Sequence, residues 1–203
     1  SDDVAGDVPL CLREVEAVAE VAACDDTEIV LVSEAGPADG ARLYATLLKG
    51  SDELAWTGGA DGKTRARDLS NGWSNTHYLA NAPEAAGFAA ASYCASLTLG
   101  GFDDWHLPAQ EELLEAHANM AGGPHADAFA QAAWSSTERG AATAGTIDLA
   151  TGLSRTVDKH AARHVRCFRS DGPDNGAPVY VAGHKDVMLQ VGIEVEIVLD
   201  FDD

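Results

Sequence analysis

The stretch YCASLTLGGFDDWHLP, residues 93–108, connects two predicted helices. The first helix spans Pro83–Leu97 and ends within this stretch; a proline and an acidic residue are both favoured near a helix start. Gly100 ends this helix, since glycine readily adopts the left-handed conformation that follows a helix C-terminus. Pro108 then precedes a second helix over Ala109–Met120, which has two glutamates in its first turn. The stretch therefore predicts two helices separated by a glycine-containing turn.

Short strands are predicted on both sides of this helix pair. Six segments show apolar runs or apolar–polar alternation: Glu28–Ser33, Arg42–Leu48, Thr146–Leu149, Ser154–Val157, His164–Arg169 and Val191–Leu199. Residues Asp52–Thr76 are rich in Gly, Asp, Asn and Thr, which predicts loops between short strands. Two large aromatic residues, Trp105 and Trp134, are expected in the core. Helices and short strands together predict an α+β fold.

The chain is strongly acidic. It has 203 residues, and 33 Asp and Glu outnumber 13 Lys and Arg, for a formal net charge of −20. This charge argues against nucleic acid and anionic membrane surfaces as partners, because both would be repelled. The longest apolar run is far shorter than the roughly 20 residues needed to cross a bilayer. We therefore expect no membrane insertion and no nucleic-acid partner.

Four cysteines allow two interpretations. None of Cys11, Cys24, Cys94 and Cys167 belongs to a CxxC pair, which argues against a zinc ribbon or a thioredoxin-like site. The cysteines form either two disulfides outside the cytosol or four buried thiols inside it, and their spacing does not decide. A bond between Cys11 and Cys24 would exclude one straight helix between them. Such a helix would separate them by about 19 Å, whereas a disulfide allows roughly 7 Å.

No catalytic residues are predicted. The sequence has no GxSxG, Walker or dinucleotide-binding motif, and its adjacent glutamates point to different faces of a predicted helix. Calcium is the one cofactor that the acidic residues suggest, although no contiguous calcium loop is present. The candidate ligands are Asp103 and Asp104, with Asp148 and Asp158 as further oxygen donors. His160 and His164 lack an HExxH context and are expected to be exposed loop residues.

A longer pattern extends from the helix pair to the later strands. It consists of Tyr93–Leu97, Gly100–Pro108, Glu112-Leu113, Trp134–Glu138 and Val165–Arg169, in that order. This pattern resembles the C-terminal domain family of the collagen-like adhesin Lcl, whose hallmark is YC..L..GG..DWRLP...EL, then WSST, then VRCVR. The resemblance covers about half of the chain, roughly Asn71–Ser170. His106 and Phe168 depart from the hallmark without breaking it.

The resemblance implies a C-type-lectin-like α+β fold with two helices and short antiparallel strands. It does not explain the two ends of the chain, which are expected to be β-rich extensions. The corresponding domains are an N-terminal extension at residues 1–62, an Lcl C-terminal-like domain at 63–170 and a C-terminal strand extension at 171–203. A disulfide between Cys94 and Cys167 is also implied, and Cys11 and Cys24 are the other two disulfide candidates.

The favoured function is a non-catalytic binding module, secreted or on the cell surface, that acts as an adhesin for a glycan or a surface protein. Recognition on such a scaffold resides in loops that are free of packing demands. Residues 138–163 are the most obvious such stretch, and four of the 13 basic residues lie there. The candidate ligand-binding residues are Arg139, Arg155, Asp158, Lys159 and Arg163. Arg166 and Arg169 are expected to pair internally.

Two alternatives remain. A self-assembling extracellular filament or surface-layer subunit would be held together by terminal strands, because the alternating segment Val191–Phe201 could pair with a neighbouring subunit. An enzyme with the same fold, such as one of the formylglycine-generating type, would need reactive cysteines.

Overall fold

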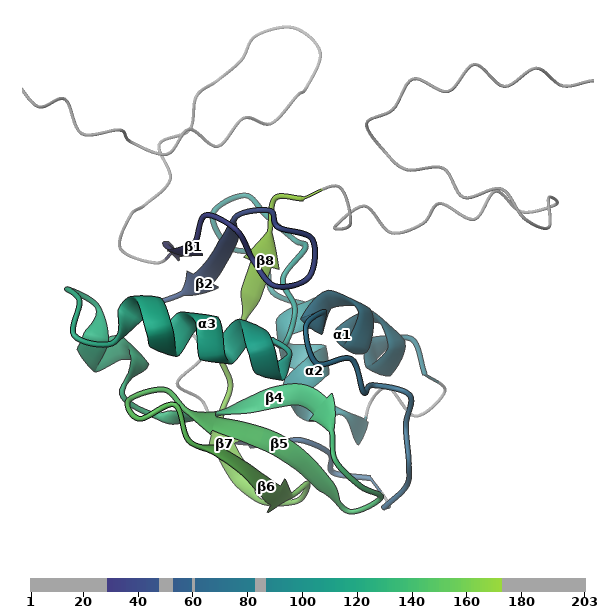
Figure 1. The fold of residues 1–203 in the computed structure, drawn as a ribbon. Helices are drawn as coiled ribbons and strands as arrows, with labels where there is room; N and C mark the ends of the chain where they lie inside the picture. The colour runs from purple at the N-terminus through teal and green to yellow at the C-terminus, as the bar shows by residue number, and fades with distance from the viewer. Residues whose placement is uncertain (1–28, 48–52, 60, 83–86, 173–203) are drawn as a thin grey trace, which may run out of the picture.

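The computed structural model describes residues 29–47, 53–59, 61–82 and 87–172 (Figure 1). These residues form a mixed α+β domain with three α-helices and two sheets. The smaller sheet contains β1 (Ile29–Ser33), β2 (Leu43–Thr46) and β8 (Phe168–Ser170), in the order β1-β2-β8. Its strand pairs are antiparallel, so β8 closes onto the hairpin formed by β1 and β2.

The larger sheet has five strands: β3 (Glu53–Ala55), β4 (Ala132–Glu138), β5 (Thr143–Asp148), β6 (Ser154–Asp158) and β7 (Ala162–His164). Their spatial order is β3-β7-β4-β5-β6. Only β4 and β7 are parallel neighbours, and the other pairs are antiparallel. β6 lies at one edge of this sheet, and four of its five residues are exposed.

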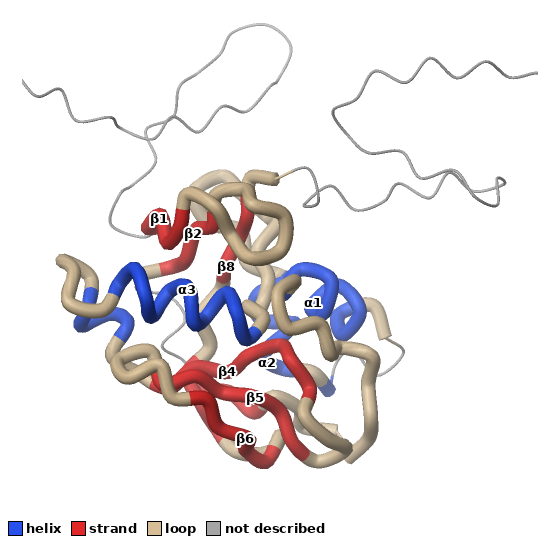
Figure 2. Tube along the Cα trace, in the orientation of Figure 1, coloured by secondary structure: helices blue, strands red, loops and turns tan. Residues whose placement is uncertain are grey.

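The helices are α1 (Gly72–Ala80), α2 (Ala89–Ala95), α3 (Gln110–Met120) and a short 3-10 helix at Ala126–Phe129. Figure 2 shows α3 between the two sheets, where it packs against β1 on one side and against β4 and β5 on the other. Glu112 stabilises the start of α3, because its Oε2 accepts the Ala109 N–H at 2.6 Å. The other two helices pack against each other, α1 also against β4 and α2 also against β3.

Two buried apolar clusters hold these elements together. The first contains Trp56, Trp105 and Trp134, none of which is more than 2% exposed. Each of the three donates its indole N–H to a backbone carbonyl, so that the polar atom is satisfied inside the core. The second cluster lies beneath α3 and consists of aliphatic side chains and two phenylalanines. The predicted core positions of Trp105 and Trp134 are confirmed.

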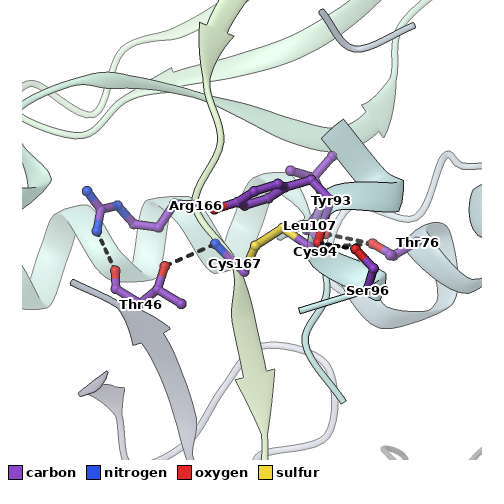
Figure 3. The surroundings of a disulfide bond; sticks show 8 residues. All are labelled: Thr46, Thr76, Tyr93, Cys94, Ser96, Leu107, Arg166 and Cys167. Carbon is purple, nitrogen blue, oxygen red and sulfur yellow. Dashed lines mark hydrogen bonds between the residues drawn. A yellow bond between two sulfur atoms is a disulfide. The ribbon is translucent and has the colours of Figure 1, made fainter. Parts of the chain in front are cut away.

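A disulfide joins α2 to the residue that precedes β8. Cys94 and Cys167 are fully buried, and their Cα atoms lie 5.3 Å apart. Thr46 of β2 lies beside the bond and exchanges hydrogen bonds with Cys167 through its N–H and its hydroxyl (Figure 3). This disulfide confirms the pairing that the resemblance implies. Cys11 and Cys24 lie outside the described residues.

The described residues form three α-helices, so the prediction of two helices was wrong. α1 begins within the segment Asp52–Thr76 that was expected to form loops. Its inner face carries Asn75 and Thr76 beside Leu79, so the apolar periodicity that signals a helix is interrupted. These two polar side chains bond to the backbone of Asp68 and Leu107. The helix expected at Pro83–Leu97 is observed as α2, and residues 83–86 lie outside the described part.

The predicted strand His164–Arg169 was also wrong, because it is divided between the two sheets. β7 ends at His164 in the larger sheet, and β8 begins at Phe168 in the smaller one. Between them Arg166 donates to backbone carbonyls of other segments and Cys167 forms the disulfide. These long-range contacts direct the chain from one sheet to the other.

The remaining strand predictions near residues 28–33, 42–48, 146–149 and 154–157 are confirmed as β1, β2, β5 and β6. The predicted strand Val191–Leu199 lies outside the described residues. β2 and β3, from the predicted N-terminal extension, pair with β8 and β7, and the domain boundaries at residues 62 and 171 stay predictions. Within the described segments, no helix has the length and apolarity needed to span a membrane.

Candidate functional site

The predicted ligand-binding segment 138–163 consists mainly of strands joined by tight turns. β5 and β6 occupy its centre, and β7 begins before its end. The candidate residues therefore lie on different elements: Arg139 after β4, Arg155 and Asp158 in β6, Lys159 after β6, and Arg163 in β7. Their positions, burial and partners decide what each of them can contact.

Lys159 lies in the interior and is only 1% exposed. Its ammonium donates to Glu138 Oε1 at 2.7 Å and to the carbonyls of Gly62 and Ala141 at 2.8 and 2.9 Å. The Lys159 Nζ atom also lies 4.7 Å from the centroid of the Trp56 ring, a cation–π contact. Since three oxygen acceptors match its three N–H donors, the ammonium belongs to the scaffold.

The Lys159–Glu138 pair fastens the loop at residues 61–67 to the end of the larger sheet. Glu138 is buried and also accepts the Arg67 Nε–H at 3.3 Å from this loop. Two backbone hydrogen bonds join the loop to residues 138 and 141. A buried ion pair of this kind is strongly destabilised when one partner is lost, so it holds a polar loop in a defined position.

A basic surface results at this end of the molecule. Lys63, Arg65 and Arg139 are exposed, and none of them has an ion-pair partner within the described residues. Arg67 adds a fourth cation, since its side chain is 57% exposed although it contacts Glu138. We call these four residues the basic loop surface. These four cations lie in a chain whose net charge is −20.

The acidic residues of the same loop are engaged elsewhere. Asp61 Oδ1 lies 3.1 Å from His160 Nε2. Asp68 Oδ1 accepts the backbone N–H groups of Ser70 and Asn71, at 2.9 and 3.0 Å, ahead of α1. These contacts direct both carboxylates toward their own neighbours, so among the exposed cations of the loop Arg67 is the one that has a carboxylate partner in the described part of the chain, Glu138.

The other predicted ligand residues are not brought together. Arg155 is exposed on β6, whereas Arg163 belongs to β7 and donates to the adjacent Ala162 carbonyl. β4 and β5 lie between these two strands, which places them about 14 Å apart. Asp158 Oδ1 accepts the His160 N–H at 2.8 Å and shapes the turn after β6. Apart from the buried Lys159, which bonds to Gly62, Arg139 is the candidate that adjoins the loop at residues 61–67, because it follows Glu138.

Sequence reasoning missed three members of the basic loop surface. Lys63, Arg65 and Arg67 alternate within five positions and account for three of the 13 basic residues. This density was a usable signal, but the composition of residues 52–76 predicted only loops between short strands. Their proximity to Arg139 depends on the buried Glu138 contacts and has no counterpart in the local sequence.

The candidate calcium ligands are dispersed. Both carboxylate oxygens of Asp104 bind Arg169, at 2.8 and 3.0 Å. Asp148 Oδ1 accepts backbone N–H groups in the turn between β5 and β6, and Asp103 is exposed on the loop before Asp104. No three His, Cys, Asp or Glu side chains of the described residues are grouped as a metal site.

The internal roles predicted for Arg166 and Arg169 are confirmed. Arg166 donates to the carbonyls of Thr46, Leu47 and Ala128, and its guanidinium lies over the Phe129 ring. Burial lowers the pKa of Arg166 to about 10, so the group remains a cation at neutral pH. Arg169 pairs with Asp104 and packs on an aromatic ring. Both arginines therefore stabilise the scaffold from within.

His160 and His164 lie on different elements and contact different residues. His160 is in a turn with its side chain 47% exposed, as predicted, whereas His164 lies in β7 with its side chain 25% exposed. Its Nε2 is 3.5 Å from Glu53 on β3, so the prediction of a loop position for His164 was wrong. A turn at residues 159–161 separates the two histidines, and their Nε2 atoms lie near different carboxylates, those of Asp61 and Glu53.

Comparison with known protein families gives one match. Residues 46–169 match the model of the Lcl C-terminal domain. The matched region is more than half of the chain and runs from the end of β2 into β8. It includes the disulfide and the whole basic loop surface. No curated protein matches the chain.

Proposed function

Because the chain belongs to the Lcl C-terminal domain family, we propose that it is an extracellular, non-catalytic binding module of the adhesin type whose ligand is an acidic glycan. The family takes its name from a collagen-like adhesin. The buried disulfide supports a secreted or cell-surface location, since such bonds persist mainly in oxidising environments. A C-type-lectin-like arrangement of the two sheets and the helices is part of this proposal.

The basic loop surface is the observation that supports an acidic ligand. Arginine binds carboxylate and sulfate groups through two parallel N–H donors, which gives geometric specificity as well as attraction. The strong negative charge of the remaining chain repels a polyanion. A polyanionic glycan is therefore restricted to the basic loop surface and is oriented there by charge complementarity.

The test removes the exposed cations and leaves the buried anchors in place. A Lys63→Ala/Arg65→Ala/Arg139→Ala variant should bind tetragalacturonate about tenfold more weakly and lose part of the salt dependence of binding. Arg42→Ala is the control, because it removes one exposed cation immediately before β2, at the smaller sheet. Calorimetric titration measures the binding of both variants, and urea unfolding checks that their stability is unchanged. Equal binding by the triple variant and the parent chain would refute the role of this surface.

The alternative of a self-assembling filament or surface-layer subunit rests on terminal segments that lie outside the described residues. Among the described residues, no contact favours it over the binding module. Association without a ligand would be detected in the NMR experiment described below, as signals that change with protein concentration.

A further inference from the structure

The outer face of α1 carries aromatic side chains. The inner face, formed by Gly72, Asn75, Thr76 and Leu79, is buried. Trp73 and His77, four positions apart, lie on one side of this inner face, and Tyr78 lies on its other side. Trp73 thus differs from the other three tryptophans of the chain, which are at most 2% exposed and whose indole N–H groups donate to backbone carbonyls.

Trp73 and His77 form a stacked pair. Their ring centroids are 4.9 Å apart and their planes differ by 14°. Trp73 is half-buried and His77 exposed, and within the described residues the Trp73 indole N–H has no hydrogen-bond acceptor. The described chain has four exposed large apolar residues, and two of them, Leu69 at 42% and Tyr78 at 41%, lie in α1 or just before it.

This aromatic face begins where the basic loop surface ends. The backbone N–H and carbonyl of Asp68 bond to the Asn75 side chain at 3.0 and 2.8 Å. The loop that carries Arg65 and Arg67 therefore leads directly into α1, on the same flank of the molecule (Figure 1). The exposed cations and the aromatic stack are thus carried by consecutive segments of the chain.

From this geometry we propose that Trp73 and His77 form a stacking platform for one pyranose ring of the bound glycan. The apolar C–H face of a sugar covers an aromatic ring, and the indole N–H supplies a donor for a ring substituent. The basic loop surface then binds the acidic groups of neighbouring sugars. The inference rests on the proposed function and adds a sugar subsite to it. This surface consists of one aromatic stack and two exposed apolar residues. It is smaller than a stable protein interface, which favours a sugar over a protein as its occupant.

The experiment follows the four indole N–H signals of the full chain by ¹H–¹⁵N NMR during titration with tetragalacturonate. One signal, identified by its loss in Trp73→Phe, should shift saturably, while the signals of the three buried tryptophans stay in place. Trp73→Ala should weaken binding about threefold to tenfold, and Trp73→Phe should retain most of the affinity. Leu153→Ala is the control, since Leu153 is 53% exposed in the turn before β6.

The outcomes separate the platform from the proposed function. If the triple cation variant loses binding but Trp73→Ala does not, the platform is wrong and the acidic-glycan function stands. If maltotetraose shifts the Trp73 signal and tetragalacturonate does not, the platform stands and the acidic-glycan function fails. A Trp73 signal that moves only with protein concentration would show that a second copy covers this face, which overturns the platform.

Discussion

At the scale of single residues, Lys159 shows how tertiary contacts can reverse an expectation. Lysine is almost never fully buried unless it is paired, and a lysine in a polar segment is therefore interpreted as exposed. Here the side chain crosses the interior to Glu138 and lies against Trp56. The same residue that looked like a ligand contact instead holds the loop that carries the basic loop surface.

Replacing Lys159 by methionine should lower the free energy of unfolding by about 3–5 kcal/mol, because Glu138 would remain buried without its counter-charge. Urea unfolding measures the change. Adding Glu138→Gln to the first substitution should recover part of the loss, since the uncompensated charge is removed.

Arg155→Met serves as the control for this substitution, because Arg155 is exposed on β6. It should change the free energy of unfolding by no more than about 0.5 kcal/mol. A Lys159→Met variant as stable as Arg155→Met would contradict the anchoring role of the buried pair.

At the scale of elements, α1 and α3 meet through a contact that only glycine permits. A Cβ atom at Gly72 would lie 2.3 Å from Glu112 Oε2 and 2.6 Å from the Ala109 nitrogen. The Glu112 carboxylate is fully engaged, since it accepts the Ala109 N–H and lies 3.1 Å from the buried His106 ring. The start of α3 and the start of α1 are therefore positioned by one another.

Gly72→Ala should destabilise the protein by about 1–3 kcal/mol, because the added methyl group overpacks this contact. Gly58→Ala is the matched control, since a Cβ at Gly58 would meet no atom within 4 Å. Urea unfolding of both variants gives the comparison. Equal stability of the two would show that the helix starts can separate at little cost.

At the scale of the whole molecule, charge dominates the response to solvent. A net charge of −20 on 203 residues is self-repelling, and in the described part only a few carboxylates are neutralised by ion pairs. Salt shortens the range of this repulsion from about 10 Å at 0.1 M to about 3 Å at 1 M. The folded chain brings these charges closer together than the unfolded one does, so screening favours the folded state.

The Tm measured by calorimetry at neutral pH should therefore rise by about 3 °C or more between 0.1 and 1 M NaCl. The same series near the isoelectric point, pH 4.4, should show a smaller rise, because little net charge remains to be screened. A salt effect of equal size at both pH values would point to a cause other than self-repulsion.

Local sequence alone determined the α+β class, the helix near residues 109–120, the hairpin of β5 and β6, the core tryptophans and the family. These features depend on periodicity, turn residues and motif order over short distances. Tertiary structure decided that α1 is a helix, that residues 164–169 are divided between two sheets, and that Lys159 is buried. It also assembled the basic loop surface from Arg139 and the loop at residues 61–67. Each of these features depends on partners more than 20 residues away in the chain, such as Glu138 for Lys159 and Thr46 for Cys167, and burial by distant partners leaves no trace in local sequence.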